Sequence, residues 1–493
     1  MMLKQWLCAL AVLLAGFSLP AEEPILRVGL MTDTHINEKE SSFTLVRKAF
    51  DCFKAQKADL IVHLGDIAEV PCPPGYGLYR KFFQEAFPEN PPKELFLYAT
   101  HDSNRKPEEQ YGYLNVKEQI GASNDPVSKL VLKGYPFLTF PQPVNIKEYE
   151  QILRETCAEF PGKPVFVLNH EPPYNTAHNT SHWGNIAIRK VLEHFPQVIH
   201  FSGHSHNSLR NEAMIWQGNF TAINAGCLQV WGGETAGSPQ IRKPADGVLL
   251  AELYADRLVI RRFELLPGKE YAADRPWIVP LPFDPATAPY NHARLRETTQ
   301  APQFPADPAA QAVGNDQEVL ISSLEAAPGT MQYQVELQKQ EADGSWKTFA
   351  RHDEYSNFYQ HNPAPRWQSK ISNGIFSGVE RCRALVTPVN FFGKPGKPIT
   401  IDIPAVKQQK TELIWQTDRA DQDCKVIFRK KQLSAKDGLF LLDHKVGSWA
   451  CPLLYFPEEA WNVPAGAKVR VTMEFESDLT EGTAMVLRLR YGK

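Results

Sequence analysis

Hydrophobic runs alternate with amphipathic stretches between residues 25 and 263 of this chain. The runs ILRVGLMT and DLIVHL are rich in β-branched and aliphatic residues and have the length of buried strands. Between them, Phe43, Val46, Phe50 and Phe53 recur at helical spacing. Strands that alternate with helices are typical of a layered α/β domain, which we place at residues 22–283.

The pattern changes after residue 283. Residues 284–317 are rich in proline and alanine and have no periodicity, so we interpret them as a linker or as a strap along a domain surface. Beyond them, short alternating runs such as YQVELQKQ are separated by turn residues and predict strands. We therefore expect all-β sandwich domains at residues 318–405 and at residues 406–493, the second of them jelly-roll-like.

The first 21 residues have the pattern of a secretory signal peptide. Lys4 precedes an apolar stretch from Leu7 to Leu19, and cleavage after Ala21 or after Ser18 fits the small residues there. A membrane anchor is the alternative, but the stretch is shorter than the roughly 20 apolar residues of a spanning helix. We expect a secreted, periplasmic or cell-surface protein with no membrane span after cleavage.

Composition narrows the possible partners. A net charge of −3 and a charged fraction of 22% argue against nucleic-acid binding by bulk charge. Cys8 lies in the predicted signal peptide, and the other cysteines show no CxxC spacing. The sequence therefore favours neither a zinc knuckle nor a dense disulfide framework.

Histidine or aspartate follows each of five apolar runs. Each residue taken alone could be a helix cap or a polar turn residue. However, loops at the carboxyl ends of strands in an open α/β sheet form a common crevice, and carboxylates and imidazoles are ligands of divalent transition metals. We therefore predict a metal site from the residues at these ends, which are Asp33, His35, Asp66, His101, Asp102, His170, His204 and His206.

The ordered series DTH, GD, HD, H and GHSH resembles the signature of the calcineurin-like metallophosphoesterases, over residues 25–263. The resemblance implies an α/β fold, a sandwich of two mixed β-sheets flanked by helices. It also implies two divalent transition metal ions, such as Mn, Fe or Zn, in the strand-end crevice. By this resemblance the first ion is held by Asp33, His35 and His206, the second by His170 and His204, and both by Asp66.

The resemblance also assigns a histidine to the leaving group of the substrate, and here that residue is His101, oriented by Asp102. The family normally has asparagine before this histidine, whereas this chain has Thr100. Threonine offers a hydroxyl on a side chain that is one atom shorter, so we expect a weaker ligand to the second ion. Gly65 and Gly203 are expected to allow a close backbone approach and a sharp turn, respectively, with a plain turn as the alternative at both positions.

Candidate substrate contacts lie in two segments. Arg105 is a candidate phosphate contact, with an ordinary surface arginine as the alternative. The loop EPPYNTAHNTSHWGN is either a substrate lid or an ordinary exposed loop, and its candidates are Tyr174, His178, His182 and Trp183.

These patterns predict an exported metal-dependent phosphoester hydrolase that acts on a phosphate ester. In the C-terminal half, ERCRALVTPVNFFGKPGKPITI resembles the last two strands of a fibronectin type III domain. The alternative is a surface protein whose sandwiches bind a glycan or a protein and whose metal site is structural or degraded.

Overall fold

The computed structural model describes most of the chain up to residue 405. The described residues are 22–36, 41–68, 73–99, 101–102, 113–228, 246–315, 317–327, 329–376 and 379–405, together with four short strands beyond residue 424. The predicted signal peptide and most of residues 406–493 lie outside them. Within the described part of the chain, no helix has the length and apolarity needed to cross a membrane.

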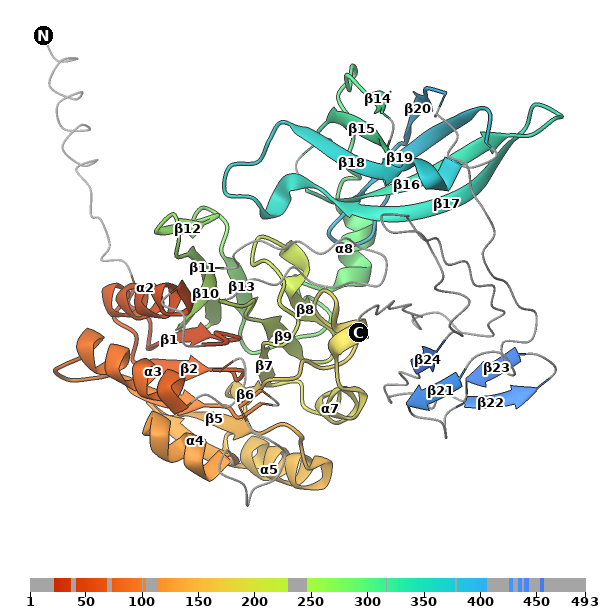
Figure 1. The fold of residues 1–493 in the computed structure, drawn as a ribbon. Coiled ribbons are helices and arrows are strands. Elements are labelled where there is room, and N and C mark those ends of the chain that lie inside the picture. Colours follow the sequence, from red (N-terminus) through yellow and green to blue (C-terminus); the bar gives the residue numbers. More distant parts are fainter. Residues whose placement is uncertain are drawn as a thin grey trace, which may run out of the picture.

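Two mixed β-sheets form the centre of the N-terminal domain (Figure 1). In the first sheet, three neighbouring strands at one end are parallel and the remaining pairs are antiparallel. In the second sheet, the middle strands are parallel and both edge strands are antiparallel, so both sheets have the expected mixed character. The first sheet has the order β12-β11-β10-β1-β2-β3, with β13 on β11, and its strands are β1 (Leu26–Met31), β2 (Leu60–His63), β3 (Lys93–Phe96), β10 (Gly247–Leu253), β11 (Arg257–Glu264), β12 (Lys269–Tyr271) and β13 (Trp277–Pro280). The second has the order β4-β5-β6-β7-β9-β8, and its strands are β4 (Ser128–Leu132), β5 (Tyr135–Phe140), β6 (Val165–Asn169), β7 (Val198–Ser202), β8 (Ile215–Gln217) and β9 (Thr221–Asn224).

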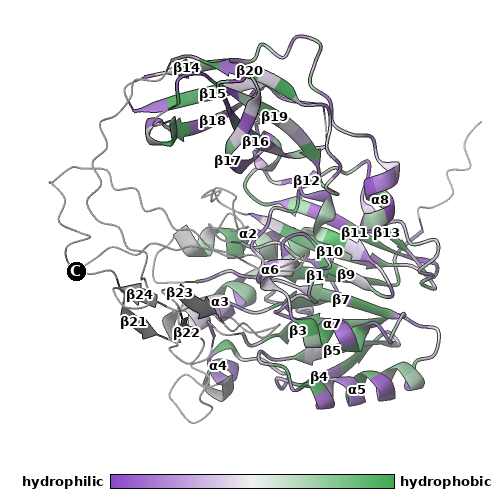
Figure 2. Ribbon diagram, turned by 90° about the vertical axis from the view of Figure 1, so that its right-hand side faces the viewer, coloured by the Kyte–Doolittle hydropathy of each residue, from purple (hydrophilic) through white to green (hydrophobic). Residues whose placement is uncertain are grey.

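Hydrophobic side chains fill the space between the sheets and the space under the helices. Figure 2 shows hydrophobic residues, in green, along central strands of this domain. Leu30 and Val62 of the first sheet share one core with Phe166 and Phe201 of the second. Helices α2 (Ser41–Ala55), α3 (Pro73–Ala86) and α4 (Tyr113–Ile120) cover the outer face of the first sheet. Helices α5 (Ile146–Glu159) and α7 (Ile186–Leu192) cover the second sheet, and α6 (Thr180–Trp183) is a single turn between strands.

The helical spacing read from the sequence corresponds to α2. The four residues that carry this spacing, Phe43, Val46, Phe50 and Phe53, are all buried against the first sheet. Amphipathic periodicity identifies this helix because burial of one face stabilises it.

The segment after the first domain contains regular structure that the sequence did not predict. Helix α8 (His292–Thr298) begins at Asn291, whose side chain accepts a hydrogen bond from the Arg294 amide, and strand β14 (Gln311–Gly314) pairs with β15. Helix α8 buries none of its residues, so it has no hydrophobic periodicity to read. The proline- and alanine-rich composition of this segment therefore did not predict its helix and strand.

Two antiparallel sheets that share one core follow this segment. One has the order β14-β15-β18 and the other β17-β16-β19-β20, and Trp367 and Val386 lie in the core between them. The resemblance to fibronectin type III stays a prediction. The strands are β15 (Glu318–Leu324), β16 (Thr330–Gln340), β17 (Trp346–Tyr355), β18 (Arg366–Ser372), β19 (Cys382–Asn390) and β20 (Ile399–Ile403).

Short single-turn elements and the last strands complete the description. The described residues contain three 3₁₀ turns, η1 (Glu212–Met214), η2 (Asn357–Tyr359) and η3 (Asn373–Phe376). Beyond residue 424, β21 (Lys425–Phe428) pairs with β24 (Leu453–Tyr455), and β22 (Leu433–Lys436) pairs with β23 (Leu439–Leu442). The predicted jelly roll falls mainly outside the described residues.

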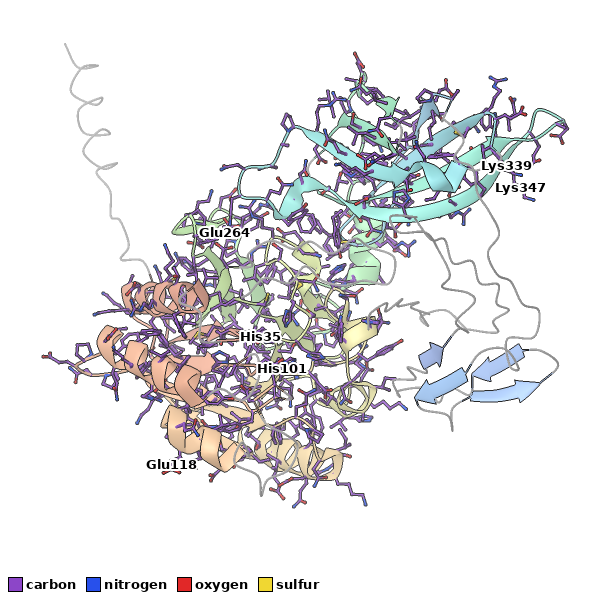
Figure 3. The ribbon with its side chains drawn as sticks, in the orientation of Figure 1. His35, His101, Glu118, Glu264, Lys339 and Lys347 are labelled. Atoms are coloured by element: carbon purple, nitrogen blue, oxygen red, sulfur yellow. The ribbon has the colours of Figure 1, made fainter. Side chains whose placement is uncertain are left out.

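A charged cluster joins the N-terminal domain to the sandwich. The Arg210 guanidinium pairs with Glu264 on β11 and donates to the backbone carbonyl of Gln360 in the sandwich. The His361 ring lies 3.3 Å from both Asp246 and Glu264. Figure 3 labels Glu264 on the side of the domain that is next to the sandwich. Arg210 is 9% exposed and Glu264 is 6% exposed, so the two units share a buried, charged interface.

Arg210→Met should destabilise the protein strongly, because it leaves Glu264 buried without its cation. The expected loss is about 3–5 kcal/mol in the free energy of unfolding measured in urea. Arg154→Met is the matched control, since Arg154 makes an exposed pair with Glu150 on one helix, and such pairs contribute about 1 kcal/mol or less. Equal losses for the two variants would contradict a stabilising role for this interface.

Candidate metal centre

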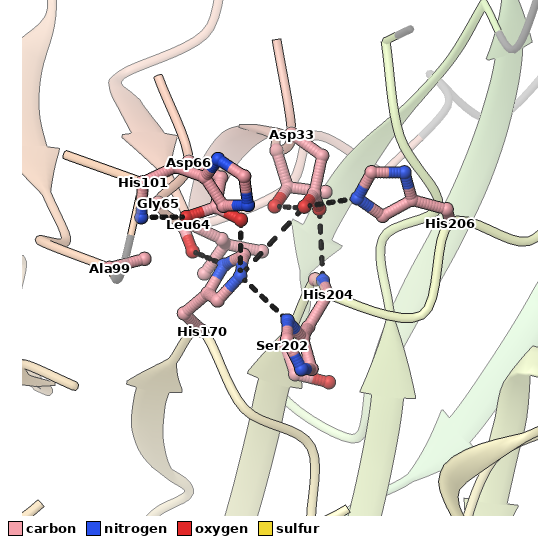
Figure 4. Close-up of polar contacts among 12 residues, drawn as sticks. Asp33, Leu64, Gly65, Asp66, Ala99, His101, His170, Ser202, His204 and His206 are labelled. Carbon is pink, nitrogen blue, oxygen red and sulfur yellow. Dashed lines mark hydrogen bonds and ion pairs between the residues drawn. The ribbon is translucent and has the colours of Figure 1, made fainter. Parts of the chain in front are cut away.

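The predicted ligands converge at one edge of the two sheets (Figure 4). Strands β1, β2, β6 and β7 each end immediately before a loop that carries an aspartate or a histidine. In each of two groups, one possible ligand atom per residue lies within 4.8 Å of the others. The first group is Asp33, His35, Asp66 and His206, and the second is Asp66, His170 and His204.

Asp33 has one oxygen held by the protein and the other facing the cluster. Its Oδ2 accepts hydrogen bonds from the Thr32 hydroxyl at 2.7 Å and from the His204 amide at 2.9 Å. Its Oδ1 lies 2.8 Å from Nε2 of His206. The orientation of this carboxylate is therefore fixed by groups on both sheets.

Asp66 lies between the two groups of donors. Its Oδ2 is 3.1 Å from Nε2 of His170 and 4.0 Å from Nε2 of His35. Its Oδ1 accepts a hydrogen bond from the His101 amide at 3.2 Å. This position is the one that the bridging role requires, and Asp66 belongs to both groups.

The imidazole nitrogens approach one another closely. Nε2 of His35 is 3.3 Å from Nε2 of His206, and Nε2 of His170 is 3.1 Å from Nδ1 of His204. Nδ1 of His170 donates to the Leu64 carbonyl at 2.9 Å, which leaves Nε2 directed at the cluster. Lone pairs and carboxylate oxygens that converge in this way fit divalent transition metal ions.

The carboxylates of the cluster favour positive charge on His170, whereas burial lowers the pKa of the neighbouring His204 to about 3. Burial disfavours ionisation of Asp33, but His206 and His170 hold the pKa of Asp33 well below its usual range. Burial likewise opposes charge on His170, yet Asp66 and Asp33 raise its pKa to about 10. The two carboxylates thus create a site for a cation, which a divalent metal ion also satisfies.

Five of the clustered residues have left-handed backbone conformations. The φ angles are 50° at Asp33, 40° at His35, 53° at Asp66, 69° at His204 and 49° at His206. Such a conformation at a residue other than glycine costs of order 1–3 kcal/mol, and these conformations cluster at functional sites. Five of the six residues that would hold the metals therefore have strained backbones.

Gly65 and Gly203 are required for different structural reasons. Gly65 has a φ of +98°, and a Cβ there would also lie 3.0 Å from Nδ1 of His170. Gly203 does not have a positive φ, so the expected sharp turn does not explain it. A Cβ on Gly203 would lie 1.9 Å from the Thr32 hydroxyl and 2.5 Å from Oδ2 of Asp33. Close approach to Asp33 is therefore the reason for glycine at this position.

His101 and Asp102 lie beside the cluster in different environments. His101 is exposed, and its ring centroid is 4.9 Å from that of His35. Asp102 is fully buried, and its oxygens accept hydrogen bonds from the backbone amides of Ile67, Ala68 and Ala99. These bonds make Asp102 a residue that positions the backbone at Ile67 and Ala68 relative to Ala99. The orientation of His101 by Asp102 stays a prediction.

The structure places some of the candidate substrate contacts beside the metal cluster and others away from it. The Trp183 ring lies 5.3 Å from the ring of His204, and His182 packs against Trp183. Tyr174 is half-buried in the same loop, and its amide donates to the Asn185 carbonyl. His178 points to the sandwich, where its Nε2 is 3.4 Å from the Tyr355 hydroxyl. Two further predicted residues lie outside the described residues, Thr100 and Arg105.

Sequence reasoning missed several residues that support the ligands. Thr32 holds Asp33, and the buried His63 and Thr34 join the loops after β1 and β2. Burial lowers the pKa of His63 to about 3, so its ring is neutral. The signal available in the sequence was a histidine inside the apolar run DLIVHL.

Gly203→Ala should weaken metal binding at the first group, because the added methyl group displaces Thr32 and Asp33. We expect a loss of about 10–100-fold in Mn²⁺ affinity, measured by titrating the metal-free protein. Gly77→Ala is the matched control, since a Cβ there meets no atom within 4 Å. An affinity in Gly203→Ala equal to that of the control would show that Asp33 is not a ligand.

One of three comparisons with known proteins found a family. Residues 26–208 match the family model of the calcineurin-like phosphoesterases. Among solved structures, the crystal structure of a dimetal phosphatase from Danio rerio is similar, with 13% sequence identity and a TM-score of 0.35, over 50% of this chain and 98% of that chain. No curated protein sequence matches this one. The similarity to calcineurin-like phosphoesterases therefore covers residues 26–208, which is less than half of the chain.

Proposed function

We propose that this protein is an exported hydrolase of phosphate esters that uses two divalent metal ions. The observation that carries the proposal is the shared position of Asp66 between two groups of ligand atoms. A single structural ion would need only one such group, so this geometry favours the hydrolase over a binding protein with a structural metal. The signal-peptide pattern in the first 21 residues supports export.

The metal-binding residues would hold two cations, and these would favour the attack of water on phosphorus. Two bound divalent cations lower the pKa of a water molecule and offset the charge of the phosphate group. Asp66 holds the two groups of donors in one arrangement, while Asp33, His35 and His206 complete the first. His170 and His204 complete the second, and the hydrogen bond from His170 to Leu64 fixes the ring that faces the reaction.

His101 is proposed as the group that protonates the leaving oxygen. Its side chain is exposed at the edge of the cluster, beside His35, where a substrate can reach it (Figure 3). Proton donation to an alkoxide by a positioned histidine is typically worth about 10²–10⁴-fold in rate. Its backbone amide, bonded to Asp66, ties its position to the centre of the site.

Trp183 and His182 are proposed to contact the organic part of the substrate. The Trp183 ring meets the ring of His204 edge to face, with an angle of 85° between the planes. An aromatic surface beside the second group of donors suits an apolar or aromatic substituent on the phosphate. Thr100 remains the proposed weak ligand of the second ion, and Arg105 the proposed phosphate contact.

Asp66→Ala should remove both metal ions and abolish hydrolysis, because both groups of donors lose the residue that they share. The check is metal content per chain after dialysis, together with turnover of p-nitrophenyl phosphate. Asp125→Ala, at an exposed aspartate paired with Lys117, should keep wild-type metal content and turnover. Two ions per chain in Asp66→Ala would contradict the shared role.

His101→Ala should slow hydrolysis of alkyl phosphate esters much more than that of nitrophenyl esters, since a good leaving group needs little protonation. The expected loss on an alkyl ester is about 10²–10⁴-fold in kcat. The exposed His194, replaced in His194→Ala, provides the matched control. Equal losses on both classes of ester would assign His101 to another role.

A further inference from the structure

His63 is a fully buried histidine that belongs to neither group of ligand atoms. It is the last residue of β2, three residues before Asp66, and none of its surface is exposed. Its ring lies between the loop after β1 and the loop after β2, with the Tyr79 ring 5.7 Å away on its other side. A buried polar ring requires hydrogen-bond partners, and those of His63 belong to both loops.

Three hydrogen bonds connect these loops through His63. The Gly65 amide donates to Nδ1 of His63 at 3.2 Å. Nε2 of the same ring is 3.0 Å from the hydroxyl of Thr34, and that hydroxyl donates to the Ile67 carbonyl at 2.8 Å. We call this series of three bonds the His63 relay.

The direction of each bond in the relay is determined by its ends. An amide can only donate, so Nδ1 of His63 is the acceptor and carries no proton. The neutral ring therefore has its proton on Nε2, from which it donates to the Thr34 hydroxyl. That hydroxyl has one proton, and the Ile67 carbonyl receives it. Only one tautomer of His63 satisfies all three bonds.

The relay surrounds the residues with strained backbones. Thr34 lies between Asp33 and His35, and Gly65 and Ile67 flank Asp66, so each relay partner is next to a residue of the metal cluster. Backbone bonds pair the same loops, from the Asp33 amide to Gly65 and from the His35 amide to Asp66. Side-chain bonds from a rigid strand can offset the cost of the left-handed conformations there.

We propose that His63 is a positioning residue that holds the Asp33–His35 loop and the Asp66 loop in the arrangement that binds both metal ions. The inference rests on the two-metal centre proposed above, because positioning matters only if these loops carry ligands. His63 acts through Thr34 and Gly65 and touches no substrate. Residues that orient metal ligands in this indirect way typically change metal affinity about 10–100-fold when they are replaced.

The tautomer of His63 provides the first test, and it needs no metal. Histidine labelled with ¹⁵N in the metal-free protein should show His63 as a neutral ring with its proton on Nε2, assigned by its disappearance from the spectrum of His63→Phe. A proton on Nδ1 would contradict the relay, whatever the protein hydrolyses.

Substitutions that keep one half of the relay provide the second test. His63→Phe retains the ring shape beside Tyr79 and loses both bonds of the His63 ring, to Gly65 and to Thr34, so it should lower Mn²⁺ affinity about 10–100-fold. His63→Asn can retain an acceptor for Gly65, and His63→Gln can retain a donor to Thr34, so each should lose less. Affinities are measured by calorimetric titration of the metal-free protein.

Thr34→Val removes the hydroxyl that His63 contacts. Its effect on Mn²⁺ affinity and that of His63→Phe should be non-additive in the double variant, because both break the same connection. If His63→Phe does not fold, Thr34→Val and His63→Gln still test the relay through the same titration. His292→Gln is the control, since His292 is a partly buried histidine that bonds the Ile215 carbonyl outside the cluster.

Two outcomes separate the relay from the proposed function. If the wild-type protein binds Mn²⁺ and His63→Phe binds it equally well while losing only thermal stability, His63 is structural and the inference is overturned. If the wild-type protein binds no divalent metal, the proposed function fails and the positioning role fails with it. A selective loss of affinity in the His63 and Thr34 variants, with His292→Gln unchanged, supports the inference.

Discussion

The carboxylate of Asp66 is the feature on which the arrangement of the site depends, because it lies between two sets of imidazole nitrogens. It can occupy this position only if four loops from two sheets end within a few ångströms of one another. The packing of the sheets through a shared apolar core provides this convergence, since it brings the ends of β1 and β2 next to those of β6 and β7. The core thus determines the chemistry at its edge.

Convergence alone does not orient the ligands, and the structure adds a second layer of constraints. Thr32 and the His204 amide hold one oxygen of Asp33, Leu64 fixes the ring of His170, and Asp102 ties backbone amides of two loops together. The left-handed conformations at the ligands show that the backbone is not relaxed there. The free energy gained by packing the hydrophobic cores offsets that strain. The same packing keeps the ligand atoms close together despite their mutual repulsion.

The order of motifs along the chain was enough to predict the α/β sheets and the members of the metal cluster. Strand ends can be read from hydrophobic runs, and the side chains that follow them include Asp33, Asp66 and His170. The supporting contacts could not be predicted, because Thr32, His63 and Gly203 act through partners that are far away in sequence or in another loop. Arg210 at the sandwich interface and helix α8, which buries no residue, also leave no periodic signal.

The most direct test of the two-metal centre is anomalous diffraction from crystals of the protein grown with Mn²⁺. The account predicts two anomalous peaks, one on each side of the Asp66 carboxylate, with the first near Asp33 and His206 and the second near His170 and His204. A single peak, or peaks that do not contact Asp66, would contradict it.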